Sequence, residues 1–313
     1  MSAIRIEGLT KTYGAVRALD GLDLSVEPGA VFGFLGPNGA GKTTTIRILT
    51  GLARASGGRA TVAGTDVAGG GQAVARLIGH LPEEPAFYPW MTPYEFVDHV
   101  ARLFGLSAAD RADRVTALID QVGLGSVSRR RIGGFSRGMR QRLGLAQALV
   151  NRPEVLFLDE PVSALDPAGR KEVLELIEGL QGQCTVFMSS HILADVERVC
   201  DTVAIVAKGR LLTQGPRAEL VQRYALPIFE LEADPPAVDV LTRWSEALRS
   251  LPWVESSTVD GLTARIVVRD VAVAKGALLP GALAAGLTPT RYQLVRPTLE
   301  EVFLRLIGED GAG

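Results

Sequence analysis

The chain has 313 residues, of which 47% are apolar and 22% charged, and its formal net charge is −2. This composition excludes a disordered chain, the near-zero charge gives no sign of nucleic-acid binding, and no apolar run reaches the roughly 18 residues of a membrane-spanning helix. The two cysteines, Cys184 and Cys200, have neither metal-type nor redox-type spacing, which favours a reducing compartment.

The N-terminal part predicts strands that lead into a glycine-rich loop. Apolar and polar residues alternate at Ile4 and Ile6 and again at Leu22, Leu24 and Val26, as in half-buried strands. A continuous apolar run at 31–35 then leads directly into the segment 36–44, and a helix is predicted over 43–52.

The middle of the chain predicts alternating helices and strands. One helix starts near Thr92, where Glu95 completes a capping box. Further helices are predicted at about 109–122, 136–150, 167–180 and 193–199, with strands at 155–158, 185–189 and 202–207. This alternation indicates an α/β fold with a mainly parallel sheet.

The composition changes near Tyr224. From 228 to 295 the predicted order is β-α-β-β-α-β, which is typical of a small ferredoxin-like α+β domain, and a last helix starts at Thr298 with a capping box completed by Glu301. We therefore predict two domains, 1–223 and 224–313, the first of which contains a helical subdomain at about 84–150.

Residues 36–43 match the phosphate-loop pattern in full. Glycines let backbone amides form an anion nest, to which the following helix adds its positive end. Lys42 would contact the β- and γ-phosphates, the Thr43 hydroxyl would bind magnesium, and Thr44 would reach the α-phosphate. The predicted nucleotide-binding residues are Gly36, Pro37, Asn38, Gly39, Ala40, Gly41, Lys42, Thr43 and Thr44. The strand before and the helix after disfavour a chance glycine-rich turn.

The strand at 155–158 delivers two carboxylates at its carboxyl end, where ligands bind in open α/β sheets. We predict that Asp159 holds magnesium and that Glu160 is the general base for the attacking water. Two acidic residues after a strand are often only a solvated strand end, but together with the phosphate loop they predict hydrolysis of ATP with Mg²⁺.

The segment 135–142, Phe-Ser-Arg-Gly-Met-Arg-Gln-Arg, resembles the signature of the ABC ATPase family, and the resemblance covers about 3–215. It implies an ABC-type P-loop core with an antiparallel β subdomain and a helical subdomain. It also implies that Tyr13 stacks on adenine, that 163–166 with Asp166 form the D-loop, and that His191 is the catalytic switch histidine. A lone histidine is usually structural, but the setting of His191 at a strand end disfavours that alternative.

The family's signature faces the γ-phosphate bound by the other subunit of a dimer. The resemblance thus implies that Ser136, Arg137 and Gly138 contact nucleotide across that interface. Arg137 replaces the usual glycine, and it either adds a cation there or points to solvent. Since the chain has one phosphate loop and one signature, the simplest functional unit is a homodimer.

Three segments, 81–84, the signature and 297–303, resemble the ATPases of type-2 bacterial exporters. This implies a separate membrane permease and a location at the cytoplasmic face of the membrane. The permease would dock beside 84–100, where Phe87, Tyr88, Trp90 and Met91 gather, although packing inside the helical subdomain explains these residues equally well. The alternatives are a non-transport ABC ATPase of the DNA-repair or translation type and an importer ATPase; we expect no nucleic-acid partner.

Glu83 stands where the family usually has glutamine, and we predict that it is a magnesium ligand together with Thr43 and Asp159. Because its carboxylate adds negative charge beside the γ-phosphate, hydrolysis should depend more tightly on magnesium than with glutamine. The measurement is the Mg²⁺ dependence of ATP hydrolysis by a Glu83→Gln variant, and an unchanged dependence would contradict this expectation.

Overall fold

The computed structural model describes residues 2–163, 165–224, 226–295 and 298–311. Ala164 and Pro297, which belong to two of the motifs above, lie outside the described residues. The chain divides into two compact units, Met1–Arg217 and Ala218–Gly313. This division lies at the N-terminal end of helix α8 (Arg217–Tyr224), whereas the sequence predicted a boundary between residues 223 and 224, at its C-terminal end.

The first unit contains two sheets. A four-stranded antiparallel sheet has the order β2-β1-β4-β5, formed by β1 (Ile4–Tyr13), β2 (Val16–Val26), β4 (Gly57–Val62) and β5 (Thr65–Asp66). Helix α2 (Val67–Leu77) follows it.

The second sheet of this unit is six-stranded, with the order β10-β9-β3-β8-β7-β6. Its strands are β3 (Val31–Leu35), β6 (Ile78–Leu81), β7 (Val155–Asp159), β8 (Thr185–Ser190), β9 (Thr202–Ala207) and β10 (Arg210–Pro216). All neighbouring pairs are parallel except β9 and β10. This confirms the predicted α/β fold with a mainly parallel sheet and an antiparallel β subdomain.

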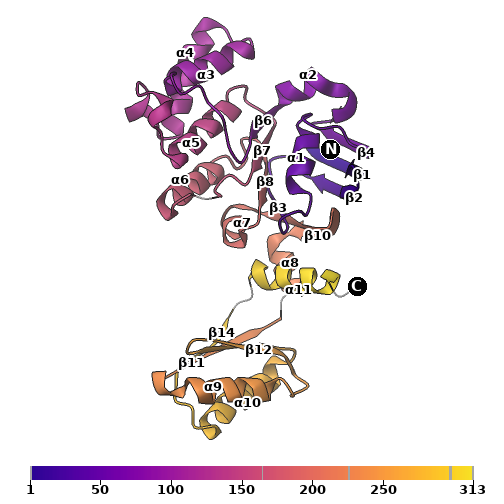
Figure 1. Cartoon of the computed structure of the whole chain (residues 1–313), viewed down its shortest axis with the longest axis vertical. Helices are drawn as coiled ribbons and strands as arrows, with labels where there is room; N and C mark the ends of the chain where they lie inside the picture. Colours follow the sequence, from indigo (N-terminus) through magenta and orange to yellow (C-terminus); the bar gives the residue numbers. More distant parts are fainter. Residues whose placement is uncertain (1, 164, 225, 296–297, 312–313) are drawn as a thin grey trace. The chain divides into compact units, whose positions relative to one another are not determined.

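A group of helices lies between β6 and β7 in the sequence and gathers on the side of the unit away from β1, β2 and β4 (Figure 1). It consists of α3 (Pro93–Leu103), α4 (Ala108–Gln121), two short 3-10 turns and α5 (Arg137–Ala148). The predicted capping box is confirmed, since the Glu95 amide donates to the Thr92 hydroxyl at 3.2 Å and the Glu95 carboxylate accepts from the Thr92 amide at 2.8 Å.

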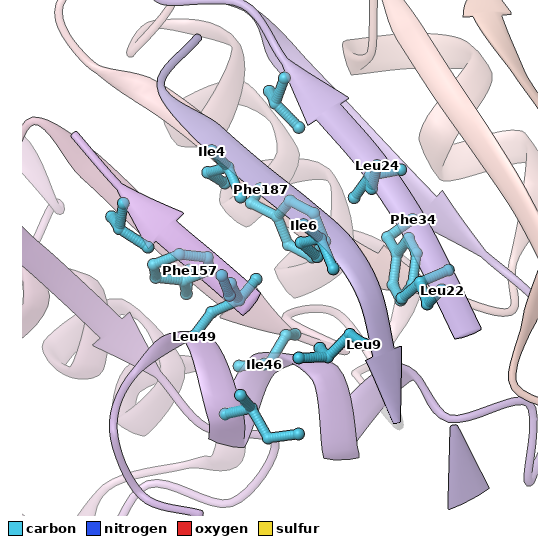
Figure 2. Packing of buried hydrophobic residues seen from close by; sticks show 14 of the residues in the cluster. Ile4, Ile6, Leu9, Leu22, Leu24, Phe34, Ile46, Leu49, Phe157 and Phe187 are labelled. Atoms are coloured by element: carbon cyan, nitrogen blue, oxygen red, sulfur yellow. The ribbon is translucent and has the colours of Figure 1, made fainter. Parts of the chain in front are cut away.

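One hydrophobic core joins the two sheets and helix α1 (Lys42–Leu49). Figure 2 shows apolar side chains of β1 and β2 beside Phe157 and Phe187, with Ile46 and Leu49 of α1 in the same cluster. Ile46 and Leu49 are fully buried, and burial of a side chain of this size contributes about 1.5–3 kcal/mol. The start of α1 is therefore held firmly on the parallel sheet.

Two more helices of the first unit start close to the carboxyl ends of strands. They are α6 (Pro167–Glu178), after β7, and α7 (Leu193–Val199), after β8. The approach of α7 to β3 is close: a Cβ added to Gly33 would lie 2.5 Å from Val196 Cγ1.

The second unit has one antiparallel sheet with the order β12-β13-β11-β14. Its elements are β11 (Ile228–Ala233), α9 (Val238–Leu248), β12 (Val254–Asp260), β13 (Thr263–Val268), α10 (Val271–Ala284), β14 (Pro289–Val295) and α11 (Leu299–Gly311). This order confirms the predicted ferredoxin-like arrangement. None of the helices in the described ranges of either unit is long and apolar enough to cross a bilayer.

Candidate nucleotide-binding site

Four neighbouring parallel strands end at one edge of the six-stranded sheet. They are β3, β8, β7 and β6, in that spatial order, and the register pairs Leu35 with Ser190 and Asp159 with Ser189. After these strands come, in the same order, the loop 36–41, His191, Glu160 and the segment with Glu83. The sheet thereby gathers the predicted chemical groups although they are far apart in the sequence.

The loop 36–41 has a conformation that only glycine fits at several positions. Gly39 and Gly41 have φ of 82° and 100°, in the left-handed region that other residues rarely adopt. A Cβ on Gly36 would lie 2.5 Å from the Val206 carbonyl oxygen. The Ala40 amide donates to the Pro37 carbonyl at 3.1 Å and closes the turn.

Lys42 is the buried cation at the centre of this site, with 7% of its surface exposed. Its Nζ donates to the Gly36 carbonyl at 2.7 Å and to the Pro37 carbonyl at 3.3 Å, and it lies 3.4 Å from Glu160 Oε1. A buried ammonium needs such compensation, because desolvation of an unpaired charge costs several kcal/mol. The arrangement keeps a positive charge at the wall of a cavity, which suits a phosphate.

Glu160 lies between Lys42 and His191. His191 Nδ1 is 2.8 Å from Glu160 Oε2, and the His191 amide donates to the same oxygen at 3.4 Å. Glu160 has φ of 48°, a left-handed conformation that is uncommon outside glycine and that often marks functional positions. The structure thus brings the predicted base and the predicted switch histidine into contact.

Asp159 is buried behind the phosphate loop. Its Oδ1 accepts from the Thr43 hydroxyl at 3.3 Å and from the Ser189 hydroxyl at 2.7 Å. A hydroxyl and a carboxylate are the hard oxygen donors that Mg²⁺ prefers, and this ion usually takes only one or two protein ligands besides substrate phosphates and water. No cluster of three or more His, Cys, Asp or Glu side chains suited to a metal occurs in the part of the chain that the structure describes. The donor set therefore fits a substrate-bound Mg²⁺.

Ser189 is a site residue that the sequence analysis did not identify. Its fully buried hydroxyl donates to Asp159 and accepts from the Glu160 amide at 2.9 Å, so it holds both carboxylate residues. Its position near the end of a buried strand is visible in the sequence. Its contacts with Asp159 and Glu160 depend on the strand register, which the sequence does not show.

A cavity of about 410 Å³ lies over these groups. Of the residues that the sequence analysis assigned to the site, the following line the cavity: Pro37, Asn38, Gly39, Gly41, Lys42, Thr43, Thr44, Glu83, Glu160 and His191. Val16, Arg17 and Ala18 also line it. Tyr13 is not among the lining residues; its side chain is 47% exposed, with Lys11 Nζ 4.6 Å from the ring centroid. Its cross-strand partner is Val16, so Tyr13 lies next to the cavity and not in its wall.

The signature residues and Asp166 lie elsewhere. Ser136 is the N-cap of α5 and accepts from the Met139 amide at 3.2 Å, while Asp166 is the N-cap of α6. None of Ser136, Arg137, Gly138 and Asp166 lines the cavity that contains Lys42. Arg137 is exposed, with Nη2 3.8 Å from Glu84 Oε1, a separation that leaves it free to move.

Comparisons with known proteins agree with this geometry. Residues 19–163 match the family model described as ABC transporter. The chain is 38% identical over 304 residues to the ABC transporter ATP-binding protein YxlF of Bacillus subtilis, with 97% of this chain and 99% of YxlF covered. It is 37% identical to the daunorubicin resistance ATP-binding protein DrrA3 of Streptomyces coeruleorubidus, with 99% and 97% covered.

Solved structures agree at the level of the fold. A structure of an ATP-binding subunit of an ABC transporter matches with a TM-score of 0.65 and 28% identity, covering 71% of this chain and 93% of that one. The buried Lys42 in a phosphate loop, the two carboxylates at the end of β7 and these similarities lead to one conclusion: the chain belongs to the ATP-binding proteins of ABC transporters and is an ATPase.

Proposed function

We propose that this chain is the ATP-hydrolysing subunit of an exporter, that it works as a dimer closed by ATP, and that it energises a separate membrane permease. The observation that carries the proposal is the contact set of Lys42, Glu160 and His191 at the wall of one cavity. The daunorubicin-resistance relative, aligned over nearly the whole chain, supports the exporter assignment.

In the proposed chemistry each side chain has one task. Lys42 lies where it would neutralise charge on the β- and γ-phosphates, and Glu160 would accept a proton from the attacking water. His191 contacts Glu160 and would hold that carboxylate toward the water. Thr43 and Asp159, with Glu83 at the cavity wall, would hold Mg²⁺, which when bound neutralises phosphate charge.

The composition of the cavity wall supports the proposed dimer. The residues that would complete the site around the γ-phosphate are Ser136, Arg137 and Gly138, and they line no part of the Lys42 cavity of their own protomer. In the proposed dimer these residues come from the second copy, and Asp166 lies at the same interface.

Replacing Glu160 with Gln should lower ATP hydrolysis by about 10²–10⁴-fold, because an amide cannot act as a general base. ATP binding should persist, and the bound ATP should hold a stable dimer. Phosphate release and light scattering after size-exclusion chromatography measure the two effects.

The matched control is Glu27→Gln, which changes an exposed carboxyl in the turn before β3. It should hydrolyse ATP at the wild-type rate. A Glu160→Gln chain that binds ATP and stays monomeric at every concentration would contradict the dimer.

Replacing Ser189 with Ala should raise the Mg²⁺ concentration needed for half-maximal hydrolysis, because Asp159 loses the hydroxyl that fixes its orientation. We expect a shift of about 10-fold or more. Titration of hydrolysis with MgCl₂ at saturating ATP measures it.

Ser257→Ala is the control, since it also removes a buried hydroxyl, but in the second unit, where it is 2.6 Å from Ser245. If both variants lose stability and Ser189→Ala does not change the Mg²⁺ concentration needed for hydrolysis, the role given to Ser189 is wrong.

The permease would dock on the aromatic residues that follow Glu84. Phe87 packs on Phe96 of α3 with ring centroids 5.0 Å apart, so it belongs to the fold of the helical region. The ring centroids of Tyr88 and Trp90 are 5.2 Å apart, and the two residues are 46% and 62% exposed. Exposed aromatic side chains are common anchors of protein interfaces, and these two support a docking surface.

Trp90→Glu should abolish co-purification of a multi-helix membrane protein with the full chain from solubilised membranes, and should leave hydrolysis by the isolated chain unchanged. Leu52→Glu is the control, because Leu52 is a similarly exposed apolar residue, at 67%, outside this region. Equal recovery of the membrane protein with Trp90→Glu and wild type would show that Trp90 is not part of the docking surface.

A further inference from the structure

Helices α6 and α7 start beside two of the motifs of the site. α6 begins directly after Asp166, and the Arg170 amide donates to the Asp166 carbonyl at 2.9 Å, so Arg170 lies in the first turn. α7 begins two residues after His191, and Asp195 lies in its first turn. The Nε of Arg170 donates to Asp195 Oδ1 at 2.6 Å and connects these two turns.

Asp195 is an unusual core residue. Its relative exposure is 1%, and its Oδ2 has no hydrogen-bond partner among the described residues. Burial raises the pKa of Asp195, the Arg170 hydrogen bond opposes that shift, and the charge of Glu160 adds to it. Asp195 is buried while Arg170 is one-third exposed, and an ion pair of this kind adds little to stability compared with apolar residues of the same volume.

Stability has other sources at this place. On one side, Val196 of α7 packs into the space that Gly33 leaves on β3. On the surface, Arg198 of α7 already lies 3.4 Å from Glu175 and 3.9 Å from Glu178 of α6. The buried pair is therefore not needed to connect the two helices.

The pair joins α6 to the first turn of α7. This helix has no side-chain cap, since its N-cap residue is Ile192. The Asp195 amide donates to the Ile192 carbonyl at 3.2 Å, and the Ile192 amide donates to the Ser190 hydroxyl at 2.9 Å. Asp195, whose carboxylate accepts from Arg170, thus lies in the turn that follows His191.

We propose that Arg170 and Asp195 are positioning residues for hydrolysis: their ion pair holds the turn from which His191 contacts Glu160, and it links that turn to the loop at Asp166. The proposal rests on the proposed roles of Glu160 and His191. Its consequence is that a displacement at Asp166, where the second copy would contact the chain, reaches His191 through one side-chain pair.

The test compares Asp195→Asn and Arg170→Gln with Arg198→Gln, all in the full chain at a temperature where each variant is folded. The first two should lower kcat by about 10–100-fold, as expected when a catalytic group is misplaced, with KM for ATP within about twofold of wild type. Arg198→Gln removes the surface pair between the same two helices and should leave kcat unchanged. Arg170→Gln keeps the test valid if Asp195→Asn does not fold, since Arg170 is partly exposed.

A second measurement reports His191 itself. The chain has three histidines, His80, His99 and His191, so ring ¹⁵N signals are assignable by comparison with a His191→Gln chain. Asp195→Asn and Arg170→Gln should move the His191 signals and leave those of His80 and His99 in place, and Arg198→Gln should move none. A purely structural role would lower the unfolding temperature without this selective change.

The outcomes separate this proposal from the proposed function. Loss of hydrolysis in His191→Gln with wild-type kcat in both pair variants would overturn the positioning role alone. Wild-type hydrolysis by His191→Gln would overturn the role of His191 and the positioning role with it. A fall in kcat with unchanged His191 signals would also overturn the positioning role.

Discussion

The parallel register of β3, β8, β7 and β6 is the constraint on which the site depends. Parallel neighbours have their carboxyl ends at the same edge, so four loops from distant parts of the sequence must meet there. A shift of one residue in β7 against β8 would turn Asp159 to the other face of the sheet and separate it from Ser189. β3, β7 and β8 are buried along their whole length, as strands covered on both faces are, and the polar residues at the ends of β7 and β8 pair with one another in this register.

This edge concentrates charge that the fold does not need for stability. Lys42, Asp159 and Glu160 are all at most 8% exposed. The Gly36 carbonyl accepts from Lys42, the Ser189 hydroxyl donates to Asp159, and the Glu160 carboxylate lies between Lys42 and His191. Buried charges held in this way are oriented before a ligand arrives, which is the main contribution a protein makes to phosphoryl transfer. The left-handed conformation of Glu160 contributes to this orientation, since it turns the side chain back toward Lys42 and His191.

The features that could be predicted from the sequence are those that a short run of neighbouring residues determines. The phosphate loop, the acidic pair at 159–160 and the capping box at Thr92 each consist of neighbouring residues whose chemistry is visible without the fold. Ser189 was missed because its partners Asp159 and Glu160 lie at the end of another strand, which only the sheet register brings beside it. Helix α2 was missed because three consecutive glycines weaken its helical pattern, and Gly71, with φ of 31°, interrupts it. The stacking of Tyr13 on adenine was predicted from a resemblance and stays a prediction, and its cross-strand partner Val16 lines the cavity.

If the proposed dimer completes the site, each protomer needs a contact through which the other protomer affects it. In the proposed dimer, the second copy approaches at Ser136, Gly138 and Asp166, none of which contacts the Lys42 cavity of the same chain. The path from Asp166 to Glu160, the proposed general base, is short: Arg170 lies one helical turn further on, Asp195 accepts its hydrogen bond, and His191 precedes Asp195 by four residues. Breaking this pair would leave the Asp195 carboxylate buried without a partner, so the two turns that it connects should move together. In the proposed dimer, we therefore expect a displacement at Asp166 to reach His191 through this pair and not through the apolar packing of α7 on β3.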